Sequence, residues 1–173
     1  ISLSFTNTAE DVALLRQRLV ELDHPEIGAV FKIETRRGFD NLPDILLEAL
    51  KFPACGVMIA RGDLAAECGF ERMAELQEEI LWICEAAHVP VIWATEVLEE
   101  LAKRGHASRA EISDAAMSQA AECVMLNKGT YILEAVRTLN DILHRMQDHQ
   151  SKKRSMMRKL GLAADYAAAG EDS

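Results

Sequence analysis

The amino-acid sequence predicts an α/β fold, a partial (β/α)8 TIM barrel of about five parallel βα units. Apolar runs typical of buried parallel strands begin near residues 1, 28, 54, 90 and 122, and a helical pattern follows each run. This spacing fits the roughly 31 residues per unit of an α/β barrel. A doubly wound sheet, the alternative, usually has a glycine-rich turn after its first strand, whereas residues 5–8 read FTNT. The barrel is therefore favoured, with three strands missing.

Composition limits the possible partners and the compartment. The chain has 173 residues, of which 49% are hydrophobic, and a net charge of −9, so we expect one globular domain and no nucleic-acid partner. No apolar run approaches the roughly 18 residues of a membrane span, and we expect no secretory signal. Four scattered cysteines without a CxxC pair predict free thiols in a reducing, cytoplasmic compartment. Because the chain begins with Ile1 in the middle of a strand pattern, we expect a piece of a longer protein.

The first half of the chain predicts three strands and the helices between them. The strands are expected at 1–5, 28–33 and 54–60. Thr8 and Asp11 form a capping-box pattern that opens the first helix. Residues 36–38 are expected to turn the chain before a helix capped by Asp40 or Asn41. After the third strand we expect a loop over 61–69 and then a long amphipathic helix over 70–87.

Two more strands and three helices complete the predicted pattern. The strands are expected at 91–95 and 122–126. One helix should run from about Glu96 to a left-handed C-cap at Gly105. Ser108 with Glu111 forms a second capping box, and Thr130 should cap the final helix. The predicted division is a barrel portion over 1–148 and a tail over 149–173, basic and then alanine-rich, forming a peripheral helix or frayed end.

Polar residues stand at the predicted carboxyl ends of four strands, where α/β barrels collect their chemistry. These residues are Lys32 with Glu34, Arg61 with Asp63, Thr95 with Glu96, and Asn127 with Lys128. Glu34 and Asp63 are hard oxygen ligands of the kind that hold Mg²⁺ together with water and substrate. Lys32 points to the same side of its strand as Glu34, where a cation can stabilise developing negative charge. A simpler interpretation is that Lys32 and Glu34 only pair with each other and Asp63 only caps a helix.

Five segments, taken together, resemble the pyruvate kinase family in order and at similar spacing. They are FKIETRRGFDNLPDIL (31–46), GVMIARGDLAAE (56–67), PVIWATEVLEEL (90–101), SRAEISDAA (108–116) and ECVMLNKGT (122–130). The resemblance covers residues 1–146 and corresponds to the last five strands of the family's catalytic barrel. It implies a cytoplasmic glycolytic enzyme that transfers a phosphoryl group from phosphoenolpyruvate to ADP, giving pyruvate and ATP. The full-length protein is expected to be a homo-oligomer.

The resemblance also implies roles for individual residues. Glu34 and Asp63 are similar to the family's ligands for Mg²⁺ or Mn²⁺, whereas the family's K⁺ ligands lie outside this chain. Lys32 resembles the catalytic lysine that stabilises the enolate and the phosphoryl group in transfer. Thr95 resembles the threonine linked to protonation of enolpyruvate. The backbone of Arg61, Gly62 and Asp63, with Thr95, resembles the cradle for the substrate carboxylate.

Several positions depart from the family pattern. Thr35 stands where the family usually has Asn, and Ala65 where Gly is usual. Glu96 and Val97 replace a Gln-Met pair, and residues 127–129 replace Ser-Gly-Glu. Because the sequence in hand matches neither the family's first barrel strands nor its C-terminal regulatory domain, we expect a truncated or divergent member that is inactive alone. Two alternatives stay open: a non-catalytic binding or regulatory relative, and a metal-dependent aldolase or lyase acting on pyruvate enolates.

Overall fold

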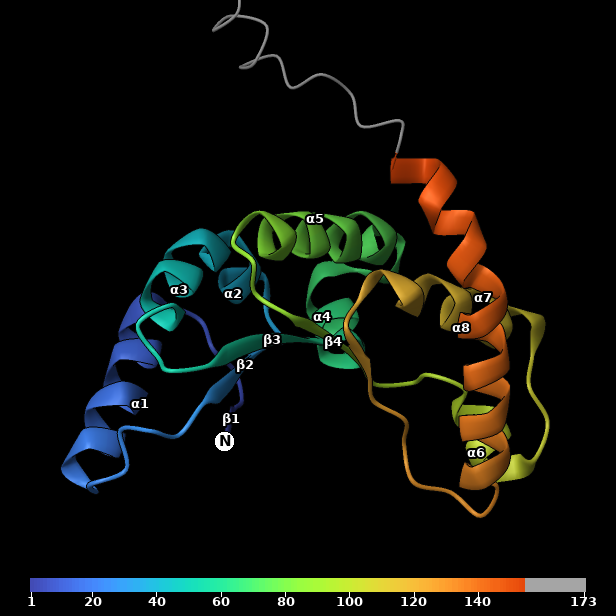
Figure 1. The fold of residues 1–173 in the computed structure, drawn as a ribbon, viewed down its shortest axis with the longest axis horizontal. Helices are drawn as coiled ribbons and strands as arrows, with labels where there is room; N and C mark the ends of the chain where they lie inside the picture. The colour runs from blue at the N-terminus through green and yellow to red at the C-terminus, as the bar shows by residue number, and fades with distance from the viewer. Residues whose placement is uncertain (155–173) are drawn as a thin grey trace, which may run out of the picture.

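The computed structural model describes residues 1–154, of which residues 148–154 are described by their backbone only. It contains a five-stranded parallel sheet with strands in the order β1-β2-β3-β4-β5. The helices form an arc around this sheet (Figure 1). This arrangement confirms the predicted partial α/β barrel.

The strands lie close to their predicted positions and become shorter toward the sheet edges. They are β1 (Ser2–Leu3), β2 (Ala29–Ile33), β3 (Cys55–Ala60), β4 (Val91–Ala94) and β5 (Cys123–Val124). In the register, Ile33 is the partner of Ile59 and Ala60 is the partner of Ala94. The carboxyl ends of β2, β3 and β4 are therefore level with one another.

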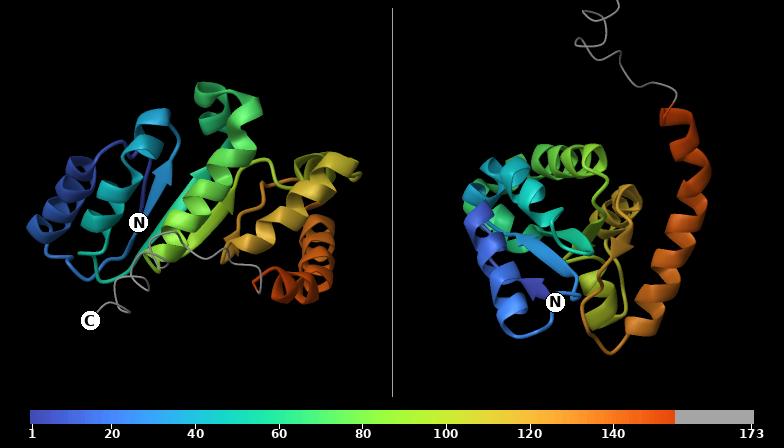
Figure 2. Two further views of the ribbon diagram at one scale, coloured as in Figure 1. Left: turned by 90° about the horizontal axis from the view of Figure 1, so that it is seen from above. Right: turned by 60° about the vertical axis from the view of Figure 1, so that its left-hand side comes forward.

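Eight α-helices and two short 3-10 turns connect the strands in the described part of the chain. The helices are α1 (Ala9–Glu21), α2 (Arg36–Asp40), α3 (Leu42–Ala49), α4 (Arg61–Cys68), α5 (Met73–Ala86), α6 (Glu99–Arg104), α7 (Arg109–Met117) and α8 (Ile132–Arg154). The 3-10 turns are η1 (Phe70–Arg72) and η2 (Ser118–Ala120). Viewed from above, α1, α3 and α5 lie side by side along the sheet, whereas α6, α7 and α8 group beyond β5 (Figure 2). No helix among the described residues is long and apolar enough to cross a membrane.

The core lies between the sheet and the helices. Alternate residues of β2 are buried, so Ala29, Phe31 and Ile33 face the helices while Lys32 points to the other side. The Phe31 ring packs edge-on against that of Phe52, with centroids 5.4 Å apart. Burial of about 25 cal/mol per Å² of apolar surface at such positions is the main force that holds the strand ends in place.

Local capping signals account for three predicted helix ends. The Thr8 amide donates to the Asp11 carboxylate at 2.9 Å and completes a capping box at the start of α1. Ser108 and Glu111 form a second capping box at the start of α7. Gly105 ends α6 with φ 79°, a left-handed conformation that a residue without a side chain adopts at little cost.

Three local predictions were wrong. Residues 36–38 do not turn the chain but begin α2, because the Thr35 hydroxyl caps the helix by accepting the Gly38 amide at 3.0 Å. Residues 61–68 are not a loop but form α4, whose Leu64 side chain is buried in the core. The final helix begins at Ile132 rather than after a Thr130 cap, because the Tyr131 amide donates to the carbonyl of Ala102.

Two further predictions concern the boundaries of elements. The helix expected from about Glu96 begins only at Glu99, because Thr95, Glu96 and Leu98 have positive φ angles. The predicted boundary between residues 148 and 149 stays a prediction, since the backbone of α8 continues to Arg154 and residues 155–173 lie outside the described part.

Candidate active site

The predicted site residues stand at the level carboxyl ends of β2, β3 and β4. Glu34 is the first residue after β2, Arg61 directly follows β3, and Thr95 directly follows β4. The strand register carries these three positions to one edge of the sheet, with neighbouring parallel strands about 4.8 Å apart. The structure therefore gathers the candidates at the end of the barrel where barrel enzymes place their active sites.

Lys32 and Glu34 form a mostly buried ion pair. The Lys32 Nζ atom lies 2.8 Å from Glu34 Oε1, and the two side chains are 25% and 2% exposed. Lys32 Nζ also donates to Ser4 Oγ at 3.2 Å, while the Phe5 amide donates to Glu34 Oε2. Both carboxylate oxygens of Glu34 are thus held in place, as a buried charge requires. The two side chains therefore pair with each other, a contact that both interpretations of these residues allow.

Gly62 and Thr95 meet across the ends of β3 and β4. The Gly62 amide, in the first turn of α4, donates to Thr95 Oγ1 at 3.0 Å. Asp63 follows in the same turn, and its side chain is exposed. The start of α4 therefore presents backbone N–H groups and the positive end of the helix dipole beside a hydroxyl group, a setting that favours an anion.

The Arg61 side chain is buried against the carboxyl end of β4, a placement that the sequence did not reveal. Its Nε atom donates to the carbonyl of Ala94 at 2.9 Å, and its Nη2 atom donates to the carbonyl of Thr95. Its Nη1 atom pairs with Asp114 on α7, and its guanidinium lies 4.9 Å from the ring centroid of Trp93. Only the backbone of Arg61 is therefore available for the predicted carboxylate cradle. The side chain instead positions the segment that carries Thr95.

That segment has an unusual backbone conformation. The φ angles of Thr95, Glu96 and Leu98 are 63°, 59° and 47°, which non-glycine residues seldom adopt. Residues kept in such conformations cost on the order of 1–3 kcal/mol each and persist where neighbours over-determine them. The Arg61 guanidinium supplies that restraint by binding the two carbonyls that begin the segment.

The altered 127–129 segment packs against α6. A Cβ on Gly129 would lie 2.1 Å from the carbonyl oxygen of Ala102, so only glycine fits there. The pKa of the Glu99 carboxyl is lowered, first by the hydrogen bond from Lys103 and to a smaller extent by one from Asn127. The segment therefore contacts the helix after β4.

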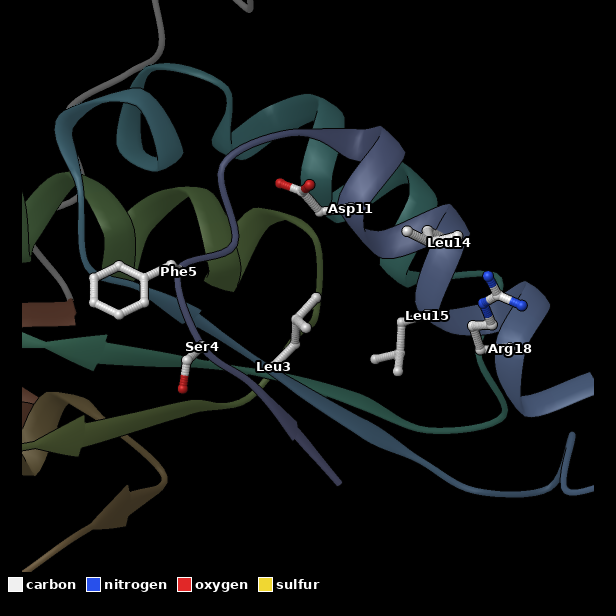
Figure 3. Close-up of a pocket in the computed structure, with 7 residues that line it drawn as sticks. All are labelled: Leu3, Ser4, Phe5, Asp11, Leu14, Leu15 and Arg18. Atoms are coloured by element: carbon white, nitrogen blue, oxygen red, sulfur yellow. The ribbon is translucent and has the colours of Figure 1, made fainter. Parts of the chain in front are cut away.

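A hollow of about 290 Å³ lies between β1 and α1 (Figure 3). Leu3, Ser4, Phe5, Asp11, Leu14, Leu15 and Arg18 line it. Ser4 and Phe5 belong both to this hollow and to the contacts of the ion pair. The Asp11 carboxylate accepts the amides of Asn7 and Thr8, so it is already engaged in the capping box at the start of α1.

The donor set fits a magnesium ion better than a metal held wholly by the protein. Among the described residues, no three or more His, Cys, Asp or Glu side chains are grouped so that they could hold a metal ion. Glu34 and Asp63 are the two carboxylates that the sequence predicts as ligands, and Mg²⁺ is usually held by one or two carboxylates together with water and substrate oxygens. The residues present are compatible with such an ion.

A parallel α/β barrel segment with polar groups at the carboxyl ends of its strands is the architecture of a barrel enzyme's active face. A family model described as pyruvate kinase, barrel domain, matches residues 1–136. The chain is 38% identical to a pyruvate kinase of Kluyveromyces lactis over 142 residues, which cover 79% of this chain and 27% of that protein. It is 34% identical to a pyruvate kinase of Bacillus licheniformis over 160 residues, which cover 89% of this chain and 26% of that protein.

The chain therefore belongs to the pyruvate kinase family, a family of phosphotransferases. It spans about a quarter of the length of the curated relatives it matches.

Proposed function

We propose that the full-length protein transfers the phosphoryl group of phosphoenolpyruvate to ADP, giving pyruvate and ATP. In this proposal the chain supplies the metal and enolate half of the site and does not turn over alone. The observation that carries the proposal is the level alignment of three strand ends, with the buried Lys32–Glu34 pair on β2 and the Gly62–Thr95 contact between β3 and β4. Phosphoryl transfer depends mainly on such positioning and on charge neutralisation.

Glu34 and Asp63 would hold Mg²⁺ or Mn²⁺. When bound, the ion would supply positive charge against the phosphoryl and enolate oxygens. K⁺ is expected from the family, with ligands outside this chain. Lys32 would add a second positive charge beside the ion. Its contacts with Glu34 and Ser4 hold the ammonium group in place. A cation held in place before the reaction stabilises developing negative charge without reorganisation.

The start of α4 would bind the substrate carboxylate. The amides of Gly62 and Asp63 belong to its first turn, and Thr95 Oγ1 accepts the Gly62 amide at 3.0 Å. A carboxylate that took over this amide would leave the Thr95 hydroxyl beside the enolate, where it is proposed to take part in protonation. The proposal also includes a cytoplasmic location and a homo-oligomeric full-length protein. Free cysteines at positions 55, 68, 84 and 123 support the location.

Asp63→Ala in the full-length protein tests this function. We expect it to abolish metal-dependent turnover of phosphoenolpyruvate with ADP, because one of the two carboxylates for the ion is lost. Glu67→Ala, which removes an exposed carboxylate from the last turn of the same helix, is the matched control and should keep turnover. Full turnover by Asp63→Ala would contradict the assignment. Metal-dependent binding of phosphoenolpyruvate by a wild-type protein without turnover would favour the non-catalytic alternative, and cleavage of a carbon–carbon bond would favour the lyase.

A further inference from the structure

Glu96 places a carboxylate beside the start of α4. Its Oε1 atom lies 3.4 Å from the position that a Cβ on Gly62 would take, and Thr95 Oγ1 lies 3.7 Å from the same position. Glu96 has a left-handed backbone with φ 59°, and its side chain reaches Gly62 beyond the end of the neighbouring strand β3. A negative charge thus stands next to the backbone N–H groups that the proposed function gives to the substrate carboxylate.

The surroundings of Glu96 leave this charge uncompensated. Glu99 and Glu100, farther along the same segment, are each paired with a cation of α6, Lys103 and Arg104. Glu96 is exposed and takes part in none of the ion pairs found among the described residues. The start of α4 lies close to this carboxylate and carries the positive end of the helix dipole.

We propose that Glu96 sets the affinity for anionic substrates: it holds a competing carboxylate at the start of α4 and so weakens their binding. The inference rests on the proposed function, because it needs the substrate carboxylate to bind at Gly62 and Asp63. Because Glu96 is exposed, the repulsion is screened nearly as in bulk water, where two like charges about 5 Å apart weaken binding about fourfold to fivefold. A neutral amide of the same shape removes the repulsion while keeping the packing over Gly62.

Glu96→Gln and Glu100→Gln in the full-length protein form a matched pair for the test. Each removes one carboxylate from the segment after β4, but only Glu96 contacts the start of α4. The dissociation constant of phosphoenolpyruvate would be measured by calorimetry with saturating Mn²⁺ at low ionic strength. We expect Glu96→Gln to bind about fivefold more tightly than the wild type and Glu100→Gln to stay within about twofold. The gain should shrink at about 0.5 M KCl, because salt screens the repulsion.

Glu34→Gln separates the failure of this inference from the failure of the proposed function. If Glu34→Gln weakens binding while Glu96→Gln leaves it within twofold of the wild type, the inference is overturned and the proposed function stands. An equal gain in Glu100→Gln would likewise overturn the inference, since the effect would then come from net charge. If Glu34→Gln binds as tightly as the wild type, or if no protein in the set binds phosphoenolpyruvate, both proposals are overturned.

Discussion

Lys32→Met should destabilise the protein far more than the loss of an ordinary surface ion pair. The Glu34 carboxylate is 2% exposed and is held by Lys32 Nζ at 2.8 Å and by the Phe5 amide. Removal of the amine leaves a buried negative charge with a single amide donor. Breaking a fully buried pair costs about 3–5 kcal/mol, whereas exposed pairs are worth about 0–1 kcal/mol. Because Lys32 is 25% exposed, we expect a loss of about 2–3 kcal/mol in the free energy of unfolding.

Urea denaturation of the wild type, Lys32→Met and Lys103→Met measures this loss. Lys103 pairs with Glu99 on the exposed side of α6 and is 54% exposed, so its removal should cost less than about 1 kcal/mol. Added Mg²⁺ should restore part of the stability of Lys32→Met, because a dication bound at Glu34 replaces the missing positive charge and stabilises the folded state. A loss below about 1 kcal/mol for Lys32→Met would refute the reasoning about burial.

Two other substitutions test the supports of the site. Arg61→Lys cannot bind the carbonyls of Ala94 and Thr95 and the Asp114 carboxylate together, so we expect kcat/KM to fall about 100-fold in a folded protein. Unchanged steady-state kinetics would contradict that positioning role. Gly129→Ala would place a Cβ 2.1 Å from the Ala102 carbonyl oxygen. We expect this overlap to lower the free energy of unfolding by about 1–3 kcal/mol and the thermal midpoint by several degrees. A midpoint equal to that of the wild type would show that α6 moves aside.

The sheet could be predicted because its signals are local. Each strand is a short apolar run, and alternate burial along β2 follows from the period of two. The gathering of Glu34, Arg61 and Thr95 at one edge follows from parallel pairing alone, because strands of a barrel keep their carboxyl ends together. The two capping boxes were predictable for a similar reason, since each joins residues three positions apart.

The direction of the Arg61 side chain could not be predicted in this way. Its acceptors lie on β4 and α7, and Asp114 is 53 positions farther along the chain. The left-handed backbone of Thr95 and Glu96 also carries no sequence signal, because neither position is a glycine or an asparagine. Helix α4 was predicted as a loop because Gly62 and Asp63 are typical of turns, yet burial of Leu64 outweighs that preference.

The most direct test of the central claim is the binding of Mn²⁺ to the full-length protein, followed by electron paramagnetic resonance. If Glu34 and Asp63 share one ion, Glu34→Gln and Asp63→Asn should each weaken its binding by about tenfold or more. The double variant should lose little beyond either single change, because the two residues serve one ion. Unchanged Mn²⁺ affinity in Asp63→Asn would show that the two carboxylates do not hold a common ion, and the proposed phosphotransfer site would fail with it.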